Sequence, residues 1–226
     1  MDLRVITENF RFLILQGFIG LGAFAGGTLR LAIPAIFFGF ILGIFIGLAR
    51  LARSRWIHFP ATVYVEFFRG VPLVMVIFWF WFMIPTIIGK SLPEYSVALT
   101  AFVVFEAAYL AEIVRSGIQS VPRGQGEAAI ATGLTRHQTM RLVILPQALR
   151  NMIPALVTQF IVLLKDTSLA SIIGYVDLTK AAQIVNNREI RPFELYLFIA
   201  IVYWASSYGM SQLARGCERR MNPSLS

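Results

Sequence analysis

The sequence predicts an all-α integral membrane protein with five transmembrane helices, an N-terminal interfacial helix and a cytoplasmic helix-turn-helix loop. Of its 226 residues, 57% are hydrophobic and only 14% are charged, whereas a soluble domain carries about 25% charged residues. Apolar runs long enough to cross about 30 Å of hydrocarbon occur five times. The longest segment between two of these runs carries helix caps of its own. We therefore expect one transmembrane domain over residues 1–226.

The first apolar run, at about residues 10–24, differs from the others. It is interrupted by Gln16 and by several glycines, which favours a helix lying at the membrane surface. The sequence leaves open a sixth crossing by this run. No A-x-A-like cleavage site follows it, so we expect the segment to remain in the mature chain.

The five expected spans cover residues 28–49, 61–86, 96–116, 150–172 and 194–214. In the first, Gly39, Gly43 and Gly47 recur every fourth residue and share a helix face that another helix can approach closely. In the second, Pro72 removes a backbone donor, so we expect the helix to break there. Five spans are few for enclosing a polar path, and we therefore expect a second membrane subunit.

The basic residues indicate how the chain is oriented. Of 20 Lys and Arg residues, eleven lie at loops on one side of the spans, six on the other, and Arg30, Arg69 and Lys165 lie inside spans. Because cytoplasmic loops carry the excess of Lys and Arg, the N-terminus is expected outside and the C-terminus inside. The net charge of +8 thus reflects topology in a lipid bilayer, and we expect no nucleic-acid binding.

The longest cytoplasmic loop, residues 120–148, is predicted to fold as a short helix-turn-helix. Gly133 suits the left-handed position after the first helix. Thr135 and Gln138 have the spacing of a capping box that begins the second, which we expect to end at Pro146. The loop is much longer than the usual 2–8 residues between helices. A docking surface for a soluble partner therefore explains it better than a plain connector.

A family resemblance rests on this loop and on three other stretches. Glu127, Ala128, Ala129 and Gly133, followed after nine residues by Val143-Ile144-Leu145-Pro146, resemble the EAA loop of ABC importer permeases, with Val143 where the family prefers isoleucine. YVEFFRGVPLVM, LPQALRNMIPAL and LLKDTSLASIIG resemble the permeases for polar amino acids of the histidine, glutamine and glutamate type. Within that group, the second and third spans look most similar to glutamate/aspartate permeases.

The resemblance implies a set of partners and a division of labour. The EAA helices of such permeases fit a groove on a cytoplasmic ATPase dimer, which implies that Glu127, Ala128, Ala129, Gly133, Leu145 and Pro146 couple this chain to ATP hydrolysis. It also implies an extracytoplasmic amino-acid-binding protein and a second permease subunit, either identical or related. The chain has no G-x-x-x-x-G-K-[ST] loop. ATP and Mg²⁺ are therefore expected on the partner, and this chain is expected to hold no cofactor, metal site or catalytic group.

Charges inside the spans mark the expected substrate site, because an ionisable residue at bilayer depth is costly. We expect Arg69 to bind a substrate carboxylate and Asp166 the ammonium group, with Lys165, Thr167 and Ser168 completing the site or its gate. The alternatives are that Lys165 and Asp166 fix packing between spans, and that Arg69 reaches the surface with Glu66 as its partner. Glu106 has three open roles: a neutral hydrogen-bonding group, a partner of Arg69 or Lys165, or a residue lining the path.

Other functions fit the sequence less well. A secondary amino-acid transporter or channel independent of ATP is the main alternative, because intramembrane charges suit it equally. A membrane enzyme would need clustered catalytic residues, whereas the chain has two scattered histidines. A membrane scaffold would tolerate replacement of Arg69 and Asp166. The amino acid carried, and whether the site lies in this chain or in a partner permease, are left open by the sequence.

Overall fold

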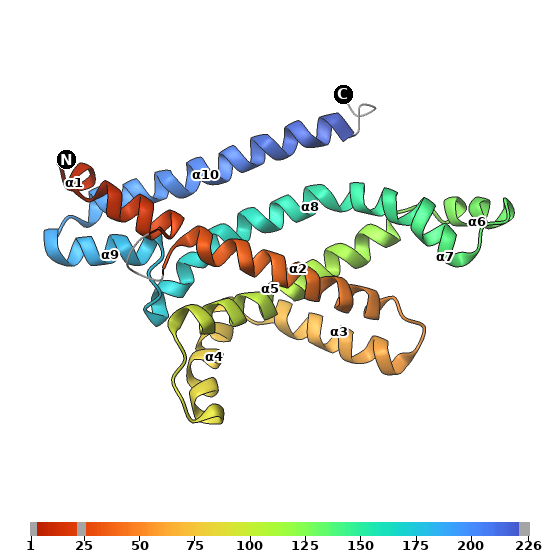
Figure 1. The fold of residues 1–226 in the computed structure, drawn as a ribbon, viewed down its shortest axis with the longest axis horizontal. Coiled ribbons are helices and arrows are strands. Elements are labelled where there is room, and N and C mark those ends of the chain that lie inside the picture. The colour runs from red at the N-terminus through yellow and green to blue at the C-terminus, as the bar shows by residue number, and fades with distance from the viewer. Residues whose placement is uncertain (1–3, 22–25, 222–226) are drawn as a thin grey trace.

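The computed structural model describes residues 4–21 and 26–221, and within these ranges the chain is helical and contains no strand. The elements, in chain order, are α1 Arg4–Arg11, η1 Phe12–Ile19, α2 Thr28–Arg50, α3 Arg55–Gly70, α4 Leu73–Ile88, α5 Glu94–Gln119, α6 Arg123–Ala131, α7 Arg136–Thr139, η2 Met140–Ile144, α8 Leu145–Asp166, η3 Thr167–Ile173, α9 Leu178–Glu189 and α10 Pro192–Met221. Figure 1 shows α1 and α9 at one end of the molecule and α6 and α7 at the opposite end.

Four helices in the described residues are long and apolar enough to cross a membrane: Thr28–Arg50, Glu94–Gln119, Arg136–Ile173 and Pro192–Gly216. A fifth candidate is the pair α3 and α4, which are bent by 106° where they meet. The all-helical membrane fold is thus confirmed. The second predicted span is two helices and not one, and Pro72 lies at the break as expected.

The N-terminal helices lie against the end of the molecule that holds α9 and α10. Leu13 and Gly17 of η1 are buried, and a Cβ on Gly17 would lie 2.7 Å from the Cβ of Ala181 in α9. Neither α1 nor η1 is long enough to count as a span. Residues 22–25 of the predicted interfacial run lie outside the described residues.

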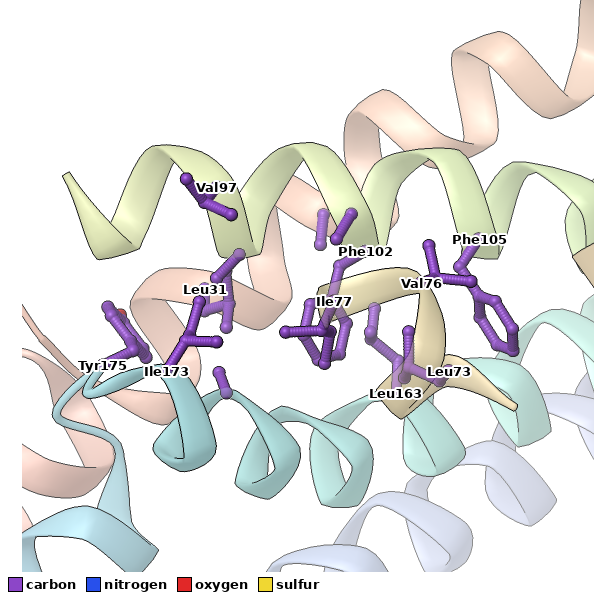
Figure 2. Packing of buried hydrophobic residues seen from close by; sticks show 14 residues of the cluster. Leu31, Leu73, Val76, Ile77, Val97, Phe102, Phe105, Leu163, Ile173 and Tyr175 are labelled. Carbon is purple, nitrogen blue, oxygen red and sulfur yellow. The ribbon is translucent and has the colours of Figure 1, made fainter. Parts of the chain in front are cut away.

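The main apolar core joins α5 to α4, α8 and η3. Figure 2 shows Phe102 and Phe105 of α5 facing Val76 and Ile77 of α4 and, beyond them, Leu163 of α8. Because the first two turns of α4 are packed against α5 on one side and against η3 and Leu163 on the other, the position of the α3–α4 break is fixed by this core. The later residues of α4 carry most of its exposed apolar side chains, among them Phe82, Met83, Ile87 and Ile88.

The glycine face predicted in the first span is the contact between α2 and α5. A Cβ on Gly43 would lie 2.8 Å from the Cβ of Leu110, and one on Gly47 would lie 2.7 Å from the carbonyl oxygen of Ala111. Backbones can approach this closely only where one helix presents hydrogen atoms in place of side chains. Among the described residues, the contact between α2 and α5 is therefore the most extensive contact between two helices.

The predicted helix-turn-helix is present, with one correction at its end. Gly133 has the left-handed backbone that was expected (φ 89°), and Thr135 and Gln138 form both bonds of the capping box. The second helix does not end at Pro146, however, but continues through η2 into α8. Pro146 lies in the first turn of α8, just after the wider π-helical turn of η2, which removes the conflict between the proline ring and the preceding turn.

At the opposite end, Asp177 begins α9 from a buried position. Its carboxylate accepts hydrogen bonds from the backbone N–H groups of Thr179 and Lys180, at 3.0 and 2.8 Å, and from the hydroxyl of Tyr203 in α10, at 3.1 Å. Burial away from water nevertheless raises the pKa of Asp177 from 3.8 to about 6. Asp177 thus links α9 to α10, but its ionised form is less favourable in the folded protein than in the unfolded chain.

We expect Gly43→Ala to destabilise the protein, because overpacking a closely packed contact typically costs about 1–3 kcal/mol. Gly209→Ala is the matched control, since a Cβ on Gly209 meets no atom within 4 Å. The measurement is the melting temperature of each purified variant in detergent. Equal melting temperatures for the two variants would contradict the packing described here.

We also expect stability to depend on the ionisation of Asp177. Because the pKa is raised on folding, the folded chain binds the proton more tightly than the unfolded chain, and stability falls as pH rises from about 4 to about 6. Asp177→Asn keeps a capping oxygen and should lose this dependence, so that it melts at the same or a higher temperature than wild type at pH 7. Melting curves from pH 4 to pH 7.5 test this, with Glu8→Gln at an exposed position as control. Identical pH profiles for wild type and Asp177→Asn would contradict it.

Candidate functional site

The candidate site is built around the break between α3 and α4. Val71 has extended backbone (φ −108°, ψ 139°), which is the conformation that a following proline imposes on the residue before it. Pro72 then begins α4 without any side-chain cap on the new helix. Irregular backbone of this kind is tolerated at membrane depth only where protein or a water-filled cavity surrounds it.

A pocket of about 520 Å³ opens at this break. Its walls come from the end of α3, the start of α4, one face of α5 and one face of α8. The lining residues are Arg69, Gly70, Val71, Pro72, Leu73, Phe105, Tyr109, Gln159, Val162 and Asp166. Two residues predicted as substrate ligands, Arg69 and Asp166, are therefore brought into one cavity from different helices.

The charges of this pocket are not neutralised within the described chain. The guanidinium of Arg69 lies over the ring of Tyr109, 5.6 Å from its centroid. Among the described residues, neither Arg69 nor Asp166 takes part in an ion pair or a side-chain hydrogen bond. The pocket thus offers a free planar cation and a free anion to a ligand that carries both charges.

The other predicted ligands lie outside the pocket. Lys165 is exposed. It does not line the pocket beside Asp166, because adjacent residues on a helix point in directions about 100° apart. The buried hydroxyl of Thr167 donates to the carbonyl oxygen of Leu164, at 2.7 Å, and so is occupied within its own helix. Ser168 is half-buried and does not line the cavity. Glu106 is fully buried behind the pocket wall.

Two polar residues of the pocket, Gln159 and Tyr109, were not predicted as site residues from the sequence. Gln159 precedes Asp166 by seven residues, which on a helix places both on one face two turns apart. Tyr109 follows Glu106 by three residues and shares a face with it in the same way. A search for polar residues at this spacing, within runs already known to be spans, would have identified both.

An ion-pair network toward the end of the bundle that carries α6 and α7 engages Glu66, the acidic residue expected as an alternative partner of Arg69. Arg50, at the end of α2, pairs with Glu112 of α5 and with Glu66 of α3, the latter at 3.3 Å. Glu112 also pairs with Arg115, three residues further along α5. Glu66 thus pairs with Arg50 in the structure and not with Arg69, which was its expected partner in the alternative reading.

A second concave surface lies at the coupling loop, at the end where α6 and α7 project from the bundle (Figure 1). A groove of about 620 Å³ runs between the end of α5 and α6, and its lining includes Gln119, Arg123, Glu127 and Ile144. The predicted coupling residues Glu127, Ala128, Gly133, Leu145 and Pro146 are exposed, whereas Ala129 is buried. Glu127 lies in this groove.

Comparison with known proteins places the site in context. Residues 35–223 match the family model for a binding-protein-dependent transport system inner membrane component. The chain is 40% identical over 201 residues to the glutamate/aspartate import permease protein GltK of Escherichia coli O6:H1, covering 85% of this chain and 89% of GltK. It is 41% identical over 196 residues to the probable glutamine ABC transporter permease protein GlnP of Bacillus subtilis, with the same two coverages.

Solved structures agree with these sequence matches. A crystal structure of an amino acid ABC transporter with histidines has a chain that is 34% identical, with a TM-score of 0.89, covering 97% of this chain and 99% of that one. An inward-facing structure of the MetNI methionine ABC transporter is similar in fold, with a TM-score of 0.72 over 92% of this chain and 98% of that one at 21% identity.

Proposed function

The chain belongs to the family of binding-protein-dependent transport system inner membrane components, and we propose that it admits acidic amino acids, glutamate and aspartate, to the cytoplasm. It is a multi-pass inner-membrane protein and the permease subunit of an ABC importer for polar amino acids. It is therefore not an enzyme and needs no cofactor of its own. Its partners are an ATPase and a solute-binding protein.

The observation that carries the substrate proposal is the pocket shared by Arg69 and Asp166. An amino acid carries a carboxylate and an ammonium group, and the pocket presents a free guanidinium and a free carboxylate from different helices. A guanidinium can bind a carboxylate through two parallel hydrogen bonds. We assign the substrate carboxylate to Arg69 and the ammonium group to Asp166.

Lys165 supports a second permease subunit. It is exposed within a candidate span, and no described residue pairs with it. A lysine at bilayer depth needs a partner, and Lys165 does not line the pocket, so we assign its charge to a partner in the second subunit. Thr167 and Ser168, which do not line the pocket, are assigned to the gate next to it.

The coupling end supports the rest of the arrangement. We propose that the ATPase binds the exposed face of α6 and α7 around Glu127 and that this end faces the cytoplasm. The N-terminal end, with α9, then faces outward, where the binding protein delivers its ligand. Residues 120–148 serve as the coupling loop of a single domain over residues 1–226.

Replacing the pocket cation should remove transport. We expect Arg69→Gln to reduce ATP-driven uptake of labelled L-glutamate by at least about tenfold, because a hydrogen bond to a charged group contributes about 1.5–3 kcal/mol. The measurement uses proteoliposomes containing the permease, its ATPase and its binding protein. Arg53→Gln, which removes the same charge from an exposed loop, should leave uptake within about twofold of wild type. Normal uptake by Arg69→Gln would place the substrate site elsewhere, and uptake without ATP would favour a secondary transporter.

Reversing the charge in the coupling groove should release the ATPase. We expect Glu127→Lys to lose most of the ATPase that co-purifies with the tagged permease, while the permease itself still folds and inserts. Glu189→Lys is the matched control, because Glu189 is also exposed on a helix but lies at the opposite end of the molecule. Full recovery of the ATPase with Glu127→Lys would refute the assignment of this docking surface.

A further inference from the structure

Gln159 and Glu106 form a hydrogen-bonded unit that joins the pocket to the interior of the bundle. Gln159, on α8, lines the pocket, and its Nε2 donates to Oε2 of Glu106, on α5, at 2.8 Å. Oε2 can accept this bond as part of an ionised carboxylate or as the carbonyl oxygen of the neutral acid. The contact links two neighbouring helices that both line the cavity.

Glu106 is held in place on its other side by α2. Its side chain has no exposed surface, and a Cβ on Gly39 would lie 3.2 Å from the Cβ of Glu106. Because glycine at position 39 provides the space that Glu106 fills, the carboxyl group has little freedom to turn. Its second oxygen, Oε1, is buried and has no hydrogen-bond partner in the described structure.

The hydrogen bond to Glu106 leaves one atom of the Gln159 amide for another partner. Because Nε2 donates to Glu106, the carbonyl oxygen Oε1 remains as an acceptor. Gln159 is half-buried, and no described residue donates to its Oε1. A residue that lines the pocket therefore keeps an acceptor without a described partner, on the same face of α8 as Asp166.

We propose that Gln159 is a specificity-determining residue whose Oε1 accepts a hydrogen bond from the substrate ammonium group, and that Glu106 is the positioning residue that fixes the amide in this orientation. The inference rests on the proposed function, since it adds a ligand to the same amino-acid site. An ammonium group has three donors, and the carboxylate of Asp166 does not use all of them. Glu106 acts through Gln159 and does not itself touch the substrate.

The test measures equilibrium binding of L-glutamate to the purified permease–ATPase complex without the binding protein. We expect Gln159→Leu and Glu106→Leu each to raise the Kd about tenfold, and the double variant to be no weaker than either single one, because both remove the same interaction. Glu106→Gln should stay within about threefold of wild type, because its amide oxygen still accepts from Gln159. Thr158→Val, at the exposed neighbouring position, should have no effect.

A second ligand identifies the group that Gln159 contacts. Glutarate has both carboxylates of glutamate and no ammonium group, so its Kd should be unchanged by Gln159→Leu. Thr158→Val should keep the basal ATPase activity and the melting temperature of wild type. If Glu106→Leu does not fold, the comparison of Glu106→Gln with Gln159→Leu still decides the question.

Four results would overturn the proposal. If Glu106→Gln weakens binding as much as Gln159→Leu, the carboxyl group itself acts on the substrate. If Gln159→Leu weakens glutarate and glutamate equally, the residue shapes the pocket and does not read the ammonium group. If Gln159→Leu binds glutamate normally while Arg69→Gln does not, the proposed function stands and this inference fails. A wild-type complex that binds no polar amino acid would contradict both the proposed function and this inference.

Discussion

The structure depends on the requirement that polar groups within hydrocarbon must be satisfied by protein, because lipid offers them no partner. The break at Val71 and Pro72 leaves backbone groups without helical partners, and Arg69, Gln159 and Asp166 place charge and polarity beside it. Each of these features would be costly on a lipid-facing surface. Gathered around one cavity whose other lining residues are mostly apolar, they provide polar partners within the bundle, which is what the passage of a charged solute requires.

The rest of the fold holds the helices that line this cavity in fixed positions relative to one another. The glycine face of α2 brings that helix against α5 so closely that added methyl groups would collide, and α5 in turn presents Phe105, Glu106 and Tyr109 to the pocket side. The first turns of α4 are held by the apolar core between α5 on one side and η3 and Leu163 on the other (Figure 2). These supports are apolar, and among the described residues the charges of Arg69 and Asp166 have no ion-pair partner within the bundle. Where pairing is structural, as in the network of Arg50, Glu66 and Glu112, the charges lie at the coupling end of the bundle and not in the pocket.

The sequence predicted the features that depend on local chemistry. Span composition, the proline break, the capping box at Thr135 and the left-handed Gly133 all follow from rules that act within a few residues. It also identified Arg69 and Asp166, because charges are conspicuous in apolar runs. It failed where the outcome depended on tertiary contacts. The partner of Glu66 is Arg50, from a different helix, and the role of Glu106 depends on Gln159, 53 residues away in the chain. The continuation of the helix past Pro146 was missed because a proline is a helix breaker locally, while a wider turn just before it removes the conflict.

That continuation bears on how the two ends of the molecule communicate. From Arg136 to Ile173 the chain forms one helical segment of 38 residues, about 57 Å long at 1.5 Å per residue. One end of this segment carries the capping box beside the coupling groove, and the other carries Gln159 and Asp166 in the pocket. The remaining pocket walls belong to α3, α4 and α5, of which α3 and α5 are joined to α2 by packing and by the Arg50 network. A displacement of the coupling helices relative to α5 would therefore move Gln159 and Asp166 against Glu106, Tyr109 and Arg69. The residues proposed as substrate ligands therefore lie on both sides of the boundary between α8 and the other pocket walls, and such a displacement would change the distances between them.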